Sequence, residues 1–192
     1  GSRHDLRVGK SPDAPDEGDV LDQKSGTFGY VHSYETSSRY DGPGLRAVLF
    51  VSGCLLRCSY CHNPDTWKMS NGIPVQLTAA IEQLRKYRHG LKVMGGGFTL
   101  SGGEPLMQDR FVVKLLAEAK AMGVHTCIET NGYLGERLSD AELGSIDLVM
   151  LGIKAWGTQR HQHLTGREPE PTLEFARRLA DFRAGVYMRT LL

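Results

Sequence analysis

Three cysteines lie close together in one short segment and are the residues of this chain best suited to chemistry: Cys54, Cys58 and Cys61. Three thiols in so short a loop cannot all pair with one another, so the spacing predicts a metal site rather than disulfides. Iron–sulfur clusters are held by cysteine thiolates, and a 4Fe–4S cluster usually takes four of them. Three local ligands therefore predict a 4Fe–4S cluster with one iron open to a ligand from outside the loop.

A structural zinc site is the main alternative, and it requires four protein ligands in a closed tetrahedron. His62 is the nearest candidate for a fourth ligand, but it directly follows Cys61, and two adjacent residues bind one ion only with difficulty. Cys127 is far away in the sequence and is flanked by apolar residues, which is typical of a packed core thiol. An electron-transfer ferredoxin would need a fourth cysteine near the other three. We therefore favour the cluster over zinc.

The composition is typical of one globular domain. The 192 residues are 40% hydrophobic and 23% charged, with a net charge of +1, and they can bury a sizeable core. No run of Lys and Arg suggests a nucleic-acid surface, and no stretch approaches the roughly 20 apolar residues that span a bilayer. Cysteines gathered in one loop indicate a reducing compartment. We expect a cytoplasmic protein that binds neither nucleic acid nor membrane.

Short apolar runs alternate with helical patterns along most of the chain, and this alternation predicts an α/β fold with a parallel sheet. Residues 1–26 are rich in Asp, Pro, Gly and Ser, so we expect a disordered leader followed by a core domain over 27–192. The expected strands are 28–36 (an edge strand or hairpin arm), 45–53, 96–103, 124–132, 148–154 and 186–192. The expected helices are 78–88, with its start marked by Thr78 and Glu82, 108–122 and 172–182.

Polar or glycine-rich motifs follow four of the expected strands at their C-terminal ends. Cys54 follows the strand at 45–53, Gly-Gly-Glu ends the strand at 96–103, Thr-Asn-Gly ends the strand at 124–132, and Lys154 ends the strand at 148–154. In barrels and in open parallel sheets, active sites form at this edge. The motifs are therefore expected to meet in one site.

Five segments of the sequence resemble a known family. The cysteine loop with the His-Asn-Pro that follows it, GCLLRCSYCHNPDTW (53–67), resembles the radical S-adenosylmethionine superfamily, and Tyr60 matches its aromatic residue before the third cysteine. The segments DGPGLRAVLFVSGC (41–54), GGGFTLSGGEPLMQ (95–108), HTCIETNG (125–132) and DLVMLGIK (147–154) resemble the pyruvate formate-lyase activating enzymes, in order and in spacing. The resemblance extends from about Gly29 to the C-terminus.

The resemblance implies a fold, two cofactors and a reaction. The fold is a partial (β/α)6-type barrel, which here ends after about its fifth strand. The open iron of the cluster binds S-adenosylmethionine, and one electron from the reduced cluster cleaves it to methionine and a 5′-deoxyadenosyl radical. That radical removes a hydrogen atom from a glycine Cα of a partner enzyme. The implied partners are a glycyl radical enzyme, with pyruvate formate-lyase the first expectation, and a flavodoxin or ferredoxin as electron donor.

The resemblance also assigns site residues to this chain. Gly102, Gly103 and Glu104 match the element that contacts the amino group of the methionine moiety, and Asp41, in a Gly-Pro turn, matches a contact to the peptide substrate. The other implied contacts to S-adenosylmethionine are Tyr60, His62, Glu129, Thr130, Gly152, Ile153 and Lys154.

Gly152 departs from the family pattern, which has Asp-Ile-Lys or Asp-Leu-Lys where this chain has Gly-Ile-Lys. The missing carboxylate would contact S-adenosylmethionine and help to hold a monovalent cation, whose other carboxylate here is Glu129 in place of an aspartate. This departure and the early end of the barrel pattern support a second hypothesis, a degenerate 4Fe–4S-binding paralogue that binds its target without turnover. A zinc-binding interaction module is a third hypothesis.

Overall fold

The computed structural model describes residues 24–39, 41–53, 72–153, 169–182 and 185–190. They form one seven-stranded sheet with the order β3-β1-β2-β4-β5-β6-β7. The strands are β1 (Phe28–Ser38), β2 (Arg46–Val51), β3 (Ile73–Gln76), β4 (Gly97–Gly102), β5 (His125–Thr130), β6 (Leu148–Ile153) and β7 (Gly185–Thr190). From β2 to β7 all neighbouring strands are parallel, whereas β1 pairs antiparallel with both β2 and β3. The predicted parallel α/β sheet is confirmed.

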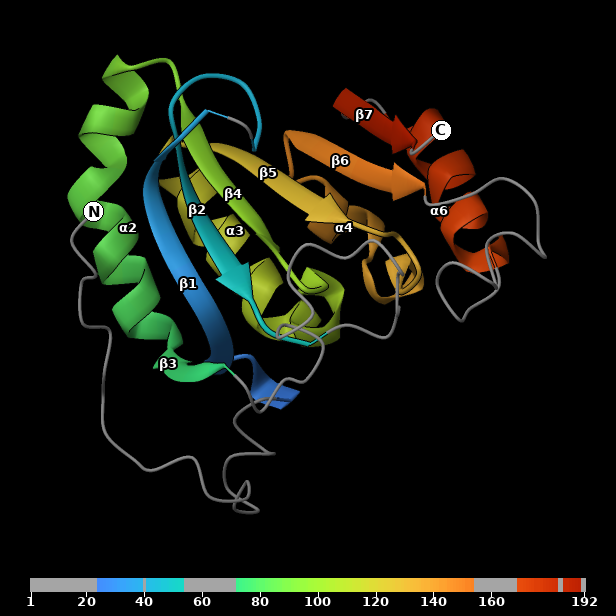
Figure 1. Ribbon diagram of the computed structural model, residues 1–192, viewed down its shortest axis with the longest axis horizontal. Helices are drawn as coiled ribbons and strands as arrows, with labels where there is room; N and C mark the ends of the chain where they lie inside the picture. Colours follow the sequence, from blue (N-terminus) through green and yellow to red (C-terminus); the bar gives the residue numbers. More distant parts are fainter. Residues whose placement is uncertain (1–23, 40, 54–71, 154–168, 183–184, 191–192) are drawn as a thin grey trace.

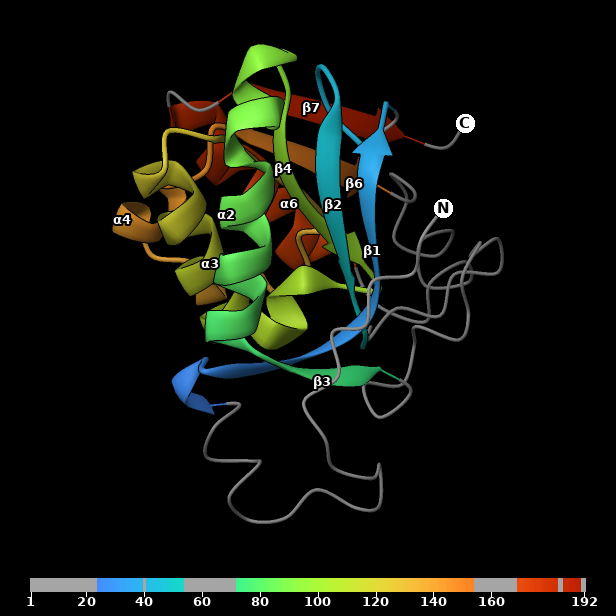
Figure 2. The same cartoon turned by 90° about the vertical axis from the view of Figure 1, so that its left-hand side faces the viewer.

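The helices form a single layer against the sheet. They are α2 (Leu77–Val93), α3 (Asp109–Ala121), α4 (Asp140–Leu143) and α6 (Glu170–Asp181), with the short 3-10 helices η3 (Pro105–Gln108) and η4 (Gly135–Arg137). Two perpendicular views place α2, α3 and α4 on one side of a curved sheet (Figures 1 and 2). Helix α6 belongs to the same layer, because Phe175 and Leu179 join the same core. Sequential parallel strands with their helices on one face form a partial barrel, and among the described residues β3 and β7 do not pair to close it.

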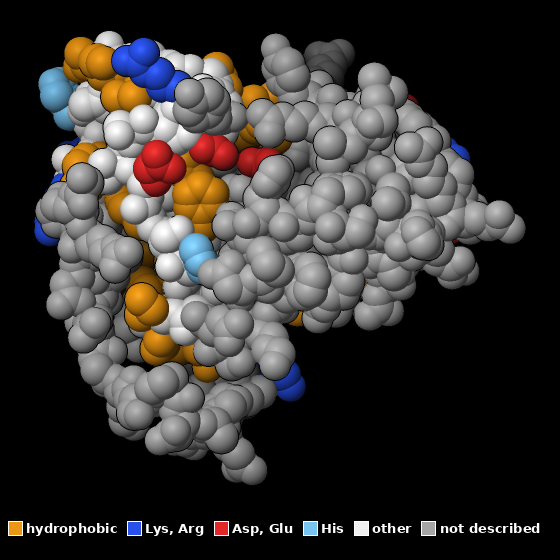
Figure 3. All heavy atoms as spheres, viewed as in Figure 1, with side chains coloured by type: hydrophobic (Ala, Val, Ile, Leu, Met, Phe, Trp, Pro, Cys, Tyr) orange, Lys and Arg blue, Asp and Glu red, His pale blue; other side chains and the backbone are white. Residues whose placement is uncertain are grey.

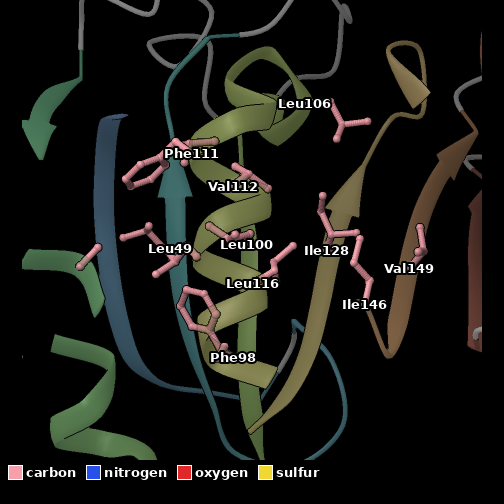
Figure 4. Packing of buried hydrophobic residues seen from close by; sticks show 14 of the residues in the cluster. Leu49, Phe98, Leu100, Leu106, Phe111, Val112, Leu116, Ile128, Ile146 and Val149 are labelled. Atoms are coloured by element: carbon pink, nitrogen blue, oxygen red, sulfur yellow. The ribbon is translucent and has the colours of Figure 1, made fainter. Parts of the chain in front are cut away.

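The main core lies between this helix layer and the sheet (Figure 4). The predicted apolar stripe of α3 is confirmed, since Phe111, Leu115 and Ala119 are buried and Met122 is partly buried against them. The sheet contributes alternate residues of its strands, as the pleat requires: Leu49, Val51, Phe98, Leu100, Ile128, Val149 and Leu151. Burial of each such side chain stabilises the fold by about 1.5–3 kcal/mol. The opposite face of the parallel strands, which we call the inner face, carries the intervening residues.

The sequence prediction missed β3. This strand is only four residues long and contains Pro74, which lacks an N–H and is therefore typical of a sheet edge. Because β3 pairs outside β1, β1 is not an edge strand, whereas the alternative expectation of a hairpin arm is confirmed by its antiparallel pairing with β2. The chain passes directly from β3 into α2, so the helix begins after Gln76 without a side-chain cap, and Thr78 does not mark its start. Helix α2 also continues past the predicted end at 88 to Val93.

The predicted disordered leader lies almost entirely outside the described residues. Residues 1–23 are not described, so the leader stays a prediction for them. The last residues of the predicted leader lie against α3: a Cβ added to Gly26, which has a φ of 80°, would come within 2.5 Å of the carbonyl carbon of Arg110. Ser25 and Gly26, which the prediction assigned to the leader, therefore contact the core domain.

Candidate functional site

The C-terminal ends of β2, β4, β5 and β6 lie along one edge of the sheet, which we call the rim (Figure 1). Gly53, the last described residue before the cysteine loop, follows β2 at this edge, and Gly103 and Glu104 follow β4. Asn131 follows β5, and Gly152 is the penultimate residue of β6. The rim thus brings together the described parts of the predicted motifs. Six of the predicted site residues lie outside the described residues: Cys54, Cys58, Tyr60, Cys61, His62 and Lys154.

The carboxylate of Glu104 ties the ends of β4 and β5 together. Glu104 is only 1% exposed. Oε2 accepts a hydrogen bond from the backbone N–H of Leu106 at 2.8 Å, and Oε1 accepts one from the N–H of Asn131 at 2.8 Å. The hydroxyl of Thr130 lies 2.7 and 2.9 Å from the two oxygens and donates to this carboxylate as well. Hydrogen bonds to an ionised acceptor are the strong ones in proteins, so this group fixes the geometry of the rim.

The turn after β5 gives Thr130, a predicted cofactor residue, a structural role as well. The Thr130 hydroxyl, which donates to Glu104, accepts from the N–H of Gly132 at 3.0 Å. The amide oxygen of Asn131 accepts from the N–H of Tyr133 at 2.9 Å, which completes the turn after β5. Sequence reasoning did not identify Asn131 as a site residue, although it lies inside the Thr-Asn-Gly motif that the reasoning singled out.

The residues just before the cysteine loop are held by the segment that follows β4. The N–H groups of Gly103 and Glu104 donate to the carbonyls of Val51 and Gly53 at 2.9 and 2.6 Å. Gly102 makes this approach possible: it has a φ of 124°, and a Cβ at this position would lie 2.2 Å from the carbonyl oxygen of Val51. The backbone that leads to Cys54 is therefore held in place by hydrogen bonds from the Gly-Gly-Glu element.

Glu129 and Gly152 belong to the neighbouring strands β5 and β6, close to the rim. The carboxylate of Glu129 accepts a hydrogen bond from the Ser101 hydroxyl at 3.2 Å on the inner face. Glu129 is in register with Met150, so Gly152 lies two residues further along β6, on the same face and nearer the rim. No group of three or more potential metal-binding side chains occurs among the residues that the structure describes. The cation expected at this position stays a prediction.

Asp41 lies at the opposite end of the sheet from the rim. Its turn precedes β2, whereas the cysteine loop follows β2, and six residues of strand span about 20 Å. The Asp41 carboxylate accepts a hydrogen bond from the Ser38 hydroxyl, and its carbonyl accepts one from the Thr99 hydroxyl at 2.7 Å. These hydrogen bonds do not test the predicted contact of Asp41 with a peptide. Any such peptide would have to reach the end of the sheet opposite the rim.

A fully buried arginine lies on the inner face, at the end of the sheet opposite the rim. Arg46 is 0% exposed, and it donates to the Thr99 hydroxyl at 2.7 Å and to the carbonyls of Pro43, Phe98 and His125 at 2.9, 3.0 and 3.2 Å. Its Nη2 also lies 2.9 Å from Nδ1 of His125. Burial lowers the pKa of Arg46 and, together with the charge of Arg46, lowers the pKa of His125. The neutral imidazole is thus favoured, and Nδ1 can accept. Sequence reasoning missed this group.

Cys127 is a buried free thiol, as predicted. It packs on the inner face with Leu148 and Met150. Burial raises the pKa of the thiol to about 11, which disfavours the reactive thiolate. A role for Cys127 as a fourth cluster ligand receives no support from this environment.

Within the described residues, no helix has both the length and the apolar character needed to cross a membrane.

Comparison with known proteins identifies the family. Residues 40–156 match the family described as a 4Fe-4S single cluster domain. The pyruvate formate-lyase-activating enzymes of two Staphylococcus aureus strains, USA300 and NCTC 8325, are each 42% identical to this chain over 171 residues, which cover 85% of this chain and 68% of the relative. The chain belongs to the pyruvate formate-lyase-activating enzyme family. Its cofactors are accordingly a 4Fe–4S cluster and S-adenosylmethionine.

Solved structures confirm the fold of this activating-enzyme family member. Streptococcus suis SuiB bound to the precursor peptide SuiA aligns with a TM-score of 0.56 at 20% identity, over 73% of this chain and 31% of that chain. SuiB bound to S-adenosylmethionine aligns with a TM-score of 0.51 at 17% identity, over 73% of this chain and 33% of that chain. The predicted partial radical S-adenosylmethionine barrel is therefore confirmed. Nothing in these comparisons favours a degenerate paralogue over an activating enzyme.

Proposed function

We propose that this chain reductively cleaves S-adenosylmethionine and generates a glycyl radical on a partner enzyme, with pyruvate formate-lyase as the partner. The observation that supports this most is the rim. There, the Gly-Gly-Glu element, the end of β5 and the backbone leading to the three cysteines are joined by hydrogen bonds. When bound, the cluster supplies the electron that cleaves the cofactor. The chain supplies the binding groups and their orientation.

The residues of the proposed site fit these cofactors in type. Three thiolates, from Cys54, Cys58 and Cys61, would hold three irons of the cluster and leave the fourth for S-adenosylmethionine. The residues that precede the loop, Val51 and Gly53, accept hydrogen bonds from Gly103 and Glu104, and glycines at 102 and 103 would let a ligand approach the backbone. The remaining proposed contacts of S-adenosylmethionine are Tyr60, His62, Glu104, Glu129, Thr130, Gly152, Ile153 and Lys154.

Charge has a part in this arrangement. The Lys154 ammonium group would offset the carboxylate of the bound S-adenosylmethionine in a site of low dielectric constant. The carboxylates of Glu104 and Glu129 would favour the cationic amino and sulfonium groups of the same cofactor. Because the Glu104 carboxylate is held by donors from Leu106 and Asn131, its own main effect would be to position the backbone around the methionine moiety.

The proposed partners are proteins. On the described part of the inner-face side, a few Asp and Glu side chains gather in one place and Lys and Arg side chains lie toward the edges (Figure 3), so this part shows no basic patch of the kind that binds nucleic acid. A flavodoxin or ferredoxin would supply the electron. Asp41 would contact the glycyl peptide, and the cytoplasm, a reducing compartment, would suit a cluster held by thiolates.

Reductive cleavage tests this proposal directly. Protein reconstituted anaerobically with iron and sulfide, reduced with dithionite and supplied with S-adenosylmethionine, should form 5′-deoxyadenosine and methionine. Chromatography of the quenched reaction measures both products. A preparation that contains about four irons per chain but forms no 5′-deoxyadenosine would contradict the activase and support the degenerate paralogue instead.

Replacing Gly152 tests the departure from the family pattern. Gly152→Asp should tighten the binding of S-adenosylmethionine about tenfold, because one charge-assisted hydrogen bond contributes about 1.5 kcal/mol. Equilibrium binding to the reconstituted protein, with and without potassium, measures the change. Gly90→Asp, at an exposed position with no atom within 4 Å of the added Cβ, introduces the same charge away from the rim and should leave the affinity unchanged. Equal affinities for all three proteins would show that position 152 does not face the cofactor.

A further inference from the structure

Gln108, at the end of η3, inserts its side chain between β1 and β2. The residue is 3% exposed, and all three described hydrogen bonds of its carboxamide go to backbone groups. Oε1 accepts from the N–H of Tyr30 at 2.7 Å. Nε2 donates to the carbonyl of Tyr30 at 2.8 Å and to the carbonyl of Ser52 at 2.9 Å. A side chain from a distant element therefore bridges two strands.

The bridge replaces a missing rung of the β1–β2 ladder. The last paired residues before the cysteine loop are Val31 and Val51. One residue further, the N–H of Ser52 still donates to the carbonyl of Tyr30 at 3.1 Å. The Tyr30 N–H, however, bonds to the Gln108 oxygen, and the Ser52 carbonyl to the Gln108 nitrogen. The carboxamide thus fills the gap that opens where β2 turns away from β1.

A primary carboxamide is the side-chain group that suits this gap. It carries an acceptor oxygen and a donor nitrogen on one plane, as a peptide group does. An ionised carboxylate of the same size could accept from Tyr30 but could not donate to Ser52. An apolar side chain could do neither and would leave two buried backbone groups without these partners.

The same short segment holds every carbonyl that leads into the cysteine loop. Gly103 binds Val51, Gln108 binds Ser52 and Glu104 binds Gly53. The Gly-Gly-Glu element and the start of the loop are therefore fixed to one another by hydrogen bonds from residues 103–108. A shift at Ser52 would be passed to Cys54, two residues later.

We propose that Gln108 is a positioning residue of the activase, which sets the orientation of the cysteine loop relative to the Gly-Gly-Glu element. The inference rests on the proposed function, since it assigns a cluster to the loop. In this role Gln108 touches neither cluster nor S-adenosylmethionine. It acts through the backbone of Ser52, so that the open iron and the methionine-binding backbone face each other at the correct distance.

The first test uses the protein without its cluster. Gln108→Leu should speed amide hydrogen exchange at Tyr30 about tenfold or more, because a buried hydrogen bond is lost. Gln108→Glu retains an acceptor oxygen and should keep Tyr30 closer to the original protection. Gln76→Leu replaces an exposed glutamine of β3 and serves as the matched control. Unchanged exchange at Tyr30 in Gln108→Leu would overturn the bridge itself.

The second test uses the reconstituted protein. Both Gln108 variants should bind iron, yet cleave S-adenosylmethionine up to about a hundredfold more slowly, since a misplacement of about 1 Å can have that effect. The electron paramagnetic resonance spectrum of the reduced cluster should also respond differently to added S-adenosylmethionine. A merely structural role would lower the melting temperature without changing this spectrum.

The outcomes separate this inference from the proposed function. If the unsubstituted protein neither assembles a cluster nor cleaves S-adenosylmethionine, the proposed function is contradicted. The exchange test would still decide whether Gln108 holds Ser52 and Tyr30. An active original protein whose Gln108→Glu variant has the same cleavage rate and spectrum would overturn the positioning role. If Gln108→Leu does not fold, Gln108→Glu carries the test, because it preserves size and one of the bonds.

Discussion

Cys58→Ala is expected to abolish assembly of the 4Fe–4S cluster and, with it, all cleavage of S-adenosylmethionine. Three cysteines already leave one iron without a protein ligand, and a loop with two thiolates retains too few ligands for a stable cluster. Cys58 lies between the other two ligands in the sequence, so its loss removes the centre of the binding loop. Iron and sulfide analysis, together with the absorption of the reconstituted protein near 400 nm, measures the effect.

Cys127→Ala is the matched control for this experiment. The Cys127 thiol is buried beside Leu148 and Met150, and burial raises its pKa. Its removal should therefore leave iron content and product formation unchanged, at a cost of about 1 kcal/mol in unfolding free energy for the small cavity. If Cys58→Ala kept its full iron content while Cys127→Ala lost iron, the ligand assignment would be wrong.

Glu104→Gln should lower the unfolding free energy of the cluster-free protein by about 3 kcal/mol. The substitution keeps the shape but replaces one oxygen by an NH₂ group. Whichever oxygen is replaced, the NH₂ group would face two donors, the Thr130 hydroxyl and the N–H of either Leu106 or Asn131, where the oxygen had accepted hydrogen bonds. Because the residue is 1% exposed, water cannot readily replace the lost acceptor. Denaturant unfolding followed by circular dichroism measures the change.

Glu136→Gln provides the comparison, because it makes the same chemical change at an exposed position of η4. It should change the unfolding free energy by less than about 0.5 kcal/mol. The two variants also differ in their expected effect on S-adenosylmethionine, since only Glu104 joins the ends of β4 and β5. Equal stabilities of Glu104→Gln and the original protein would mean that these donors do not depend on the carboxylate.

Local patterns in the sequence were sufficient for much of the fold. The alternation of apolar strands and helices predicted the parallel sheet, because buried strands and amphipathic helices have different hydrophobic periods. The stripe on α3 was predicted by the spacing of Phe111, Leu115 and Ala119 alone. The rim was predicted because parallel strands place their C-terminal ends at one edge. The short β3 lacked such a pattern and was missed, so the sequence did not show that β1, although a hairpin arm, has a strand on both sides.

The sequence by itself determined the kind of chemistry: the spacing of Cys54, Cys58 and Cys61 predicts a cluster with an open iron, and the motifs around it resemble one family. Only the tertiary structure decided how the rim is held together. Gln108 lies 78 residues from Tyr30, Arg46 lies 79 residues from His125, and Glu104 lies 27 residues from Asn131. Such pairs depend on the register of the strands and on the position of η3 relative to the sheet. No local spacing reveals them, since each side chain finds its hydrogen-bond partners only after the sheet has formed.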